Sequence, residues 1–233
     1  SGSKEDMDKA RVFFQKAIQE DSTYAWAWVG LADSWIETIF WHRVTDDDAL
    51  PQAKAAEMHA LRIDPQNGEA YGALGAINLL ERDVISSEKN LQKSLELNPN
   101  YSYAYERLAW IAVMRGQEKE SFDLYEKVLL LDPLSTRLKG SQGTIYYFIG
   151  QYKTGIEKCK EFLSLHPGDN FILWALAYCY AGNGEYEKAI ETLHQRTLGT
   201  KTNWIFAYCY SKLGRTEEAR QILDYHLERK QTT

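Results

Sequence analysis

Several features that mark enzymes, membrane proteins and nucleic-acid-binding proteins are missing from this chain of 233 residues. Because no apolar run approaches the roughly 18 residues of a membrane span, we expect no such span in these residues. Lysine and arginine number 27 against 33 acidic residues, which disfavours nucleic acid as a partner. No phosphate-binding glycine loop, H-E-x-x-H motif or G-x-S-x-G motif occurs. We therefore expect no catalysis and no cofactor, and look for function on a binding surface.

Metal binding is also not expected. Cys159, Cys179 and Cys209 lack the paired spacing of a zinc or redox site and are predicted to be buried thiols. The acidic run at 46–48 follows His42, but the alternating Asp/Asn pattern, glycine and distal glutamate of a calcium loop are missing. The acidic run is better explained as the start of a helix, where carboxylates are favourable.

Proline is scarce, and its placement is informative. Of the five prolines, Pro65, Pro99, Pro133 and Pro167 follow one another at intervals of 34 residues. That period is the length of a helix-turn-helix repeat that stacks on copies of itself, and proline cannot continue the helix before it. The sequence therefore predicts an array of helix pairs.

A common frame relates the repeats when Pro65 is placed at position 32. In the next repeat Tyr71, Leu74 and Gly75 then occupy positions 4, 7 and 8, and Ser87 and Leu91 occupy positions 20 and 24. This resembles the tetratricopeptide pattern W-x2-L-G-x2-Y…A-x3-F…P. We predict an all-α fold, a right-handed superhelical solenoid of antiparallel helix pairs with about six full repeats and an N-terminal half repeat.

The repeats are not all alike. The first full repeat is longer than 34 residues, which indicates an insertion, and Tyr178-Cys179-Tyr180 recurs as Tyr208-Cys209-Tyr210 after only 30 residues. The predicted organisation is a cloning remnant at 1–3, a half repeat (second helix only) at 4–24, a repeat at 25–67 with an insertion at about 36–50, repeats at 68–101, 102–135 and 136–169, a shortened repeat at 170–199, and a last repeat with a polar end at 200–233.

A more specific resemblance rests on four stretches of sequence. They are Lys4-Glu5-Asp6-Met7 with Ala10-x3-Phe14-x2-Ala17, Gly30-Leu31-Ala32-Asp33-Ser34-Trp35, the segment Asp48-Ala49-Leu50-Pro51-x-Ala53-Lys54-Ala55-Ala56, and Leu131-Asp132-Pro133-Leu134-Ser135. Together they resemble the C-terminal tetratricopeptide regions of bacterial one-component signalling proteins, such as winged-helix regulators, class III nucleotide cyclases and Ser/Thr kinases. The resemblance implies that the chain is the C-terminal part of a larger protein with an attached output domain.

The resemblance to tetratricopeptide repeats implies that positions 2, 5, 9, 12 and 13 of each repeat, on its first helix, line the concave face. Ten aromatic residues stand at these positions, more than stacking requires, and large aromatics are frequent anchors of protein recognition. Any single one of them is as well explained by core packing. The predicted partner-binding residues are Trp26, Tyr103, Arg107, Trp110, Arg137, Tyr147, Phe148, Phe171, Trp174, Tyr178, Lys201, Trp204 and Tyr208.

Charge along this face predicts an orientation for a bound ligand. Asp33, Glu37 and Glu69 fall towards its N-terminal end, and Arg137, Lys201 and Lys212 towards its C-terminal end, with Glu106 and Arg107 between. Such a gradient would align a ligand with separated charges. Solvation of the surface is the simpler explanation for the same residues.

These observations favour a non-enzymatic domain that binds a peptide or protein segment in an aromatic groove, as the regulatory or scaffold part of a bacterial signalling protein. A second hypothesis is a small-molecule sensor that uses the aromatic cluster of the last two repeats. A third is self-association through the N-terminal end, where Phe13 and Phe14 would otherwise expose core.

Overall fold

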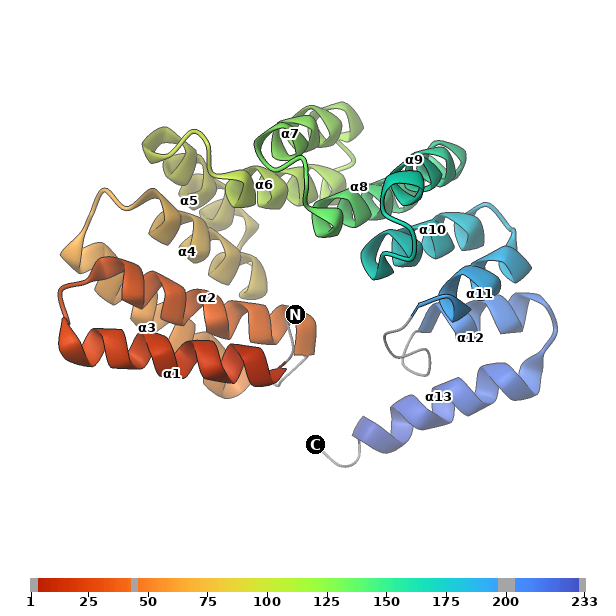
Figure 1. Ribbon diagram of the computed structural model, residues 1–233, viewed down its shortest axis with the longest axis horizontal. Helices are drawn as coiled ribbons and strands as arrows, with labels where there is room; N and C mark the ends of the chain where they lie inside the picture. Colours follow the sequence, from red (N-terminus) through yellow and green to blue (C-terminus); the bar gives the residue numbers. More distant parts are fainter. Residues whose placement is uncertain (1–3, 43–45, 197–203, 231–233) are drawn as a thin grey trace. The chain divides into compact units, whose positions relative to one another are not determined.

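The computed structural model describes residues 4–42, 46–196 and 204–230, and this part of the chain contains thirteen helices and no strand (Figure 1). The helices are α1 Lys4–Glu20, α2 Ala25–His42, α3 Asp46–Ile63, α4 Gly68–Leu80, α5 Val84–Leu97, α6 Ser102–Met114, α7 Glu118–Leu131, α8 Thr136–Phe148, α9 Tyr152–Leu165, α10 Asn170–Gly182, α11 Tyr186–His194, α12 Trp204–Lys212 and α13 Thr216–Lys230. The predicted all-α fold is confirmed.

The helices fall into two compact units. The N-terminal unit comprises Ser1–Met114 and Lys119–Leu131, and the C-terminal unit comprises Arg115–Glu118 and Asp132–Thr233. In the N-terminal unit α2 packs against α1, α3 and α4, and α4 also packs against α5 and α6. In the C-terminal unit α10 packs against α8, α9, α11 and α12. Each unit is thus built from helices that contact mainly their neighbours along the chain, as in a repeat array.

The turn inside each repeat has a recurring backbone conformation. Gly116, Gly150 and Gly184 have φ of 71°, 79° and 83°, a region that glycine adopts without steric cost. They are spaced by 34 residues, and Arg82 stands one period earlier with φ of 63°. The repeat geometry therefore imposes the left-handed conformation at this position even where the residue is not glycine.

Small residues let the paired helices approach closely. A β-carbon built on Gly75 of α4 would lie 2.7 Å from Leu91 Cγ of α5. One built on Gly143 of α8 would lie 2.5 Å from Cys159 Sγ of α9 and 2.7 Å from the β-carbon of Ala175 on α10. In these two repeats glycine at position 8 is therefore required by packing on neighbouring helices.

Position 24 of each repeat lies in the core, and one repeat breaks its apolar pattern. Leu91, Tyr125 and Cys159 occupy this position, and each is fully buried. The equivalent residue of the first full repeat is Glu57, which is also fully buried and has no hydrogen-bond partner for either carboxylate oxygen among the described residues. Burial, and then the nearby charge of Asp33, raises the pKa of Glu57 well above its ordinary value.

The close approach at Gly143 predicts a steric limit. We expect Gly143→Val to lower the free energy of unfolding by about 1–3 kcal/mol, because the new side chain overlaps Cys159 and Ala175. Thermal and urea unfolding followed by circular dichroism measure this loss. Lys153→Ala, at an exposed position of α9, is the matched control, and equal stability of the two variants would contradict the packing argument.

The carboxyl group at position 24 predicts an unusual gain in stability. We expect Glu57→Leu to raise the free energy of unfolding at neutral pH by about 1–3 kcal/mol, because leucine removes an unpaired carboxyl group from the core. Urea unfolding at constant pH measures the change. Leu91→Glu is the reciprocal control, and we expect it to destabilise the protein.

The same group predicts a direction for the pH dependence. Since the pKa of Glu57 is raised on folding, its contribution is full below the unfolded pKa of about 4.3 and is lost as the pH rises through the folded pKa. We expect stability to fall as the pH rises above about 5, and to fall less in Glu57→Leu. Parallel pH profiles for the two proteins would count against a buried carboxyl group.

Candidate binding sites

The predicted partner-binding residues that the structure describes all lie on the first helix of a repeat. They are Trp26 on α2; Tyr103, Arg107 and Trp110 on α6; Arg137, Tyr147 and Phe148 on α8; Phe171, Trp174 and Tyr178 on α10; and Trp204 and Tyr208 on α12. Lys201 lies outside the described residues.

These side chains differ in how far solvent reaches them. Trp26, Phe148 and Trp204 keep 49%, 58% and 44% of their surface exposed, so they are available to a partner. Tyr178 keeps only 4% and serves chiefly to support its neighbours. The remaining predicted residues of α6, α8 and α10 are half-buried.

The C-terminal unit holds an aromatic cluster with Tyr178 at its centre. The ring of Tyr178 lies 4.8 Å from Trp174, 5.5 Å from Trp204 and 5.1 Å from Tyr147, all edge to face. Phe148 adds an exposed ring 5.3 Å from Tyr147. Helices α8, α10 and α12 thus present one connected set of aromatic rings, in the geometry that ring quadrupoles favour.

Two aromatic members of this region were missed by the sequence analysis. Tyr152 lies 5.9 Å from Tyr147, and Tyr186 lies 6.0 Å from Tyr208. Both begin second helices and stand 34 residues apart, at position 17 of their repeats. The 34-residue period therefore contains the signal for both, at a position of the second helix.

Arg196 is a third residue that the sequence analysis missed. Its Nε is buried without a hydrogen-bond partner among the described residues, and its charge acts on Tyr178. Burial lowers the pKa of the guanidinium group. A cation with an unused donor therefore accompanies the aromatic cluster.

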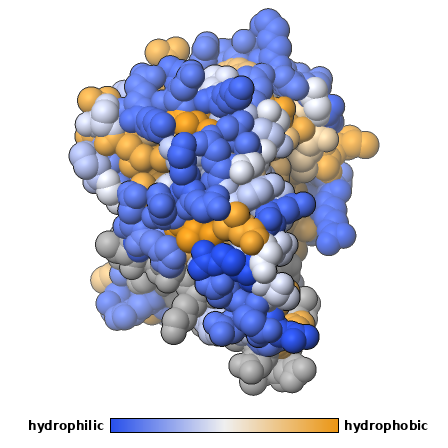
Figure 2. All heavy atoms as spheres, turned by 90° about the vertical axis from the view of Figure 1, so that its right-hand side faces the viewer, coloured by the Kyte–Doolittle hydropathy of each residue, from blue (hydrophilic) through white to orange (hydrophobic). Residues whose placement is uncertain are grey.

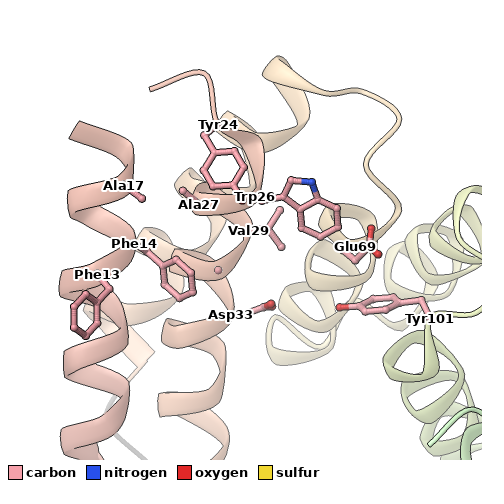
Figure 3. A pocket seen from close by; sticks show the side chains of 11 residues that line it. Phe13, Phe14, Ala17, Tyr24, Trp26, Ala27, Val29, Asp33, Glu69 and Tyr101 are labelled. Atoms are coloured by element: carbon pink, nitrogen blue, oxygen red, sulfur yellow. The ribbon is translucent and has the colours of Figure 1, made fainter. Parts of the chain in front are cut away.

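The N-terminal unit contains a pocket of about 580 Å³, within the usual range of ligand sites. Its lining is drawn in Figure 3 and comprises Phe13, Phe14, Ala17, Tyr24, Trp26, Ala27, Val29, Gly30, Asp33, Glu69 and Tyr101. Helices α1 and α2 supply most of the rings, α4 supplies Glu69, and Tyr101 precedes α6. Of the predicted partner-binding residues, Trp26 lines this pocket.

The polar groups of this pocket are mainly acidic. In Figure 3 the carboxyl group of Asp33 and the hydroxyl of Tyr101 point towards one another, with Glu69 and the indole of Trp26 beside them. Glu69 accepts a 2.6 Å hydrogen bond from Asn98 Nδ2. Burial and then the charges of Glu37 and Glu69 raise the pKa of Asp33 to about 7, although Arg107 opposes them.

Arg107 is held by its own surroundings. Its guanidinium group lies 4.4 Å from the centre of the Tyr103 ring, and its charge interacts with Glu106 and Glu37. Glu106 is buried and accepts a 3.5 Å hydrogen bond from the Tyr125 hydroxyl. These contacts give Arg107 a structural role within the unit.

The surface seen in Figure 2 is mostly hydrophilic, with apolar side chains in small groups. No helix within the described residues has the length and apolar content to cross a membrane. Nor does the described part of the chain bring together three His, Cys, Asp or Glu side chains that could hold a metal ion, and the side chains of His42 and residues 46–48 lie outside it.

Comparison with known families gives two matches. Residues 90–122 match the tetratricopeptide repeat, and residues 146–226 match subunit 3 of the anaphase-promoting complex, or cyclosome. The first match begins within α5 and the second within α8.

Among curated proteins, the transcriptional regulator HilA of Salmonella typhimurium is 28% identical over 150 residues, which is 61% of this chain and 26% of HilA. The chain therefore spans about a quarter of that relative. Among solved structures, the human IFIT1 dimer with m7Gppp-AAAA gives a TM-score of 0.74 at 18% identity, covering 95% of this chain and 53% of that one.

A tetratricopeptide repeat protein from Parabacteroides merdae gives a TM-score of 0.67 at 13% identity, covering 95% of this chain and 86% of that one. At such identities these likenesses concern the fold. With the 34-residue period, the recurring turn and the family match, they identify the chain as a tetratricopeptide repeat protein with an all-α solenoid fold.

Proposed function

We propose that this chain binds a peptide or protein segment through the aromatic side chains on the first helices of its repeats. Tetratricopeptide repeats generally act as protein-interaction modules and not as catalysts. The observation that carries the proposal is the cluster of Trp174, Tyr178, Trp204 and Tyr147, which three successive first helices build together. Rings of this kind supply large contact areas at a low entropic cost.

Solvent exposure favours a contact role for the outer members of the cluster. Trp204 and Phe148 each contact another ring of the cluster, yet they remain 44% and 58% exposed. A large part of each side chain is therefore free to contact a partner. Burying an exposed indole or phenyl ring in a partner is favourable by roughly 25 cal/mol per Å². The charge of Arg196 acts on Tyr178 of the cluster, and this positive charge favours a carboxylate on the bound segment.

The wider setting that we propose is a bacterial signalling protein in which these repeats regulate an output domain. The similarity to the transcriptional regulator HilA supports this setting. Binding would act by selecting one arrangement of the repeats, which a neighbouring domain could read as a population shift.

The test uses the aromatic side chains directly. We expect the triple variant Trp110→Ala, Trp174→Ala and Trp204→Ala to reduce capture of the partner from native cell extract at least tenfold, because anchor residues commonly contribute 1–4 kcal/mol each. Capture is quantified by mass spectrometry, and the affinity of the recovered segment is then measured with purified protein. Helical circular dichroism must remain at the wild-type value.

The matched control removes exposed apolar side chains from second helices. Leu130 on α7 and Leu165 on α9 are 80% and 70% exposed, and we expect Leu130→Ala with Leu165→Ala to leave capture unchanged. Equal loss in both variants, or no loss in the tryptophan variant, would sink the proposal.

A small-molecule sensor is the second candidate, favoured by the same aromatic cluster and the positive charge of Arg196. This function predicts that one compound in a metabolite panel raises the melting temperature, by an amount that grows with ligand concentration. Trp174→Ala should abolish the shift. If no compound in the panel raises the melting temperature and a protein is captured, the sensor function is contradicted and the protein-interaction function is supported.

A further inference from the structure

The pocket of the N-terminal unit is rich in aromatic rings and carboxyl groups, and its described lining includes no lysine, arginine or histidine. Asp33 and Glu69 face the rings of Trp26 and Tyr101 (Figure 3). Phe13 and Tyr24 are 69% and 50% exposed at the same pocket, so their rings are open to a ligand. Ring faces and carboxylates both attract cations.

The negative charge of the carboxyl groups around the pocket is only partly compensated by positively charged side chains nearby. Asp33 interacts electrostatically with three carboxyl groups, those of Glu37, Glu69 and Glu57. The opposing charge on Asp33 comes from Arg107, which is shared with Glu37 and Glu106. Negative charge is thus in excess, which disfavours an anionic ligand.

Two of these carboxyl groups, those of Asp33 and Glu57, also lack hydrogen-bond donors from the described residues. Asp33 accepts no hydrogen bond from the described residues, and both oxygens of the fully buried Glu57 lack a partner. A buried carboxyl group without partners costs stability, and groups kept at such a cost often serve a ligand. A ligand that donates hydrogen bonds and carries positive charge would satisfy Asp33 directly.

We propose that this pocket binds an alkylammonium group, with the ammonium between Asp33 and Glu69 and its aliphatic stem against Trp26 and Phe14. The apolar rings suit the stem and would be a poor environment for a hydrated metal ion. The volume of about 580 Å³ accommodates a stem of several carbons. The assignment is independent of the aromatic cluster in the C-terminal unit.

The probe is n-pentylammonium, with 1-pentanol as its neutral counterpart of similar shape. Binding is followed by the indole ¹⁵N–¹H resonance of Trp26 in protein labelled at tryptophan, assigned by its loss in Trp26→Phe. We expect the amine to shift this resonance with at least tenfold higher affinity than the alcohol. Equal affinities, or no shift with either probe, would overturn the proposal.

The double variant Asp33→Asn with Glu69→Gln separates charge from shape. It keeps the size of both side chains and removes both charges, so we expect the preference for the amine to disappear while circular dichroism stays unchanged. Retained preference would overturn the proposal. Glu96→Gln with Glu161→Gln, at exposed positions of α5 and α9, is the matched control and should bind the amine like the wild type.

The pH profile gives an independent readout. The titratable groups that interact with Asp33 are Glu37 of its own helix, Glu57 of α3, Glu69 of α4, Tyr103 and Arg107 of α6, and Tyr101. With a pKa of about 7, Asp33 ionises between mildly acidic and mildly basic pH, while the amine stays protonated. We expect affinity to rise up to about tenfold from pH 6 to pH 8, and Asp33→Asn to remove most of this rise.

Two further binding experiments distinguish whether the amine belongs to a protein or to a small molecule. A short peptide with a central lysine, compared with its norleucine counterpart, tests a side chain of a protein; free n-pentylammonium tests a small metabolite. Tighter binding of the lysine peptide would assign the pocket to a protein segment, and tighter binding of the free amine to a small ligand. A Trp26 shift that grows with protein concentration alone would mean that a second copy covers the pocket, and would overturn the proposal.

Discussion

The close approach of neighbouring helices is the constraint on which the rest of this structure depends. At Gly143 there is no room for a β-carbon between Cys159 and Ala175, so α8, α9 and α10 are fixed against one another. That contact sets where the first helices lie relative to their neighbours within the C-terminal unit. Because Trp174, Tyr178 and Tyr147 sit on α10 and α8, the spacing of the aromatic cluster follows from the same packing.

In the N-terminal unit one core position, position 24 of the first full repeat, departs from this pattern of close apolar packing. A stacked repeat needs an apolar residue at position 24, and Leu91, Tyr125 and Cys159 meet that need. Glu57 does not, and it lies within electrostatic reach of Asp33, which lines the pocket. Local violations of packing rules tend to gather at functional sites, where stability is traded for chemistry. Glu57 is therefore best understood together with the pocket rather than as a defect of the core.

The sequence predicted the fold well because the 34-residue period is a physical property of the chain, repeated at Pro65, Pro99, Pro133 and Pro167. The same period marks the positive-φ turn, including Arg82, where composition alone would not suggest it. The site was less predictable. Solvent exposure depends on which rings cover one another, so the sequence pattern does not distinguish the exposed Trp204 from the buried Tyr178. The pocket was not predicted because its lining comes from helices far apart in the chain.

The two units carry different chemistry, and the architecture makes the two sites separable. In a repeat array each element contacts mainly its neighbours, so stability is close to a sum of local terms. Asp33 and Glu69 lie in the N-terminal unit, whereas Trp174, Trp204 and Arg196 lie in the C-terminal unit. Substitutions with no shared contacts act additively on stability. A departure from additivity in binding would therefore report coupling between the units, through one ligand that engages both or through selection of one arrangement of the repeats, since packing within either unit cannot produce it.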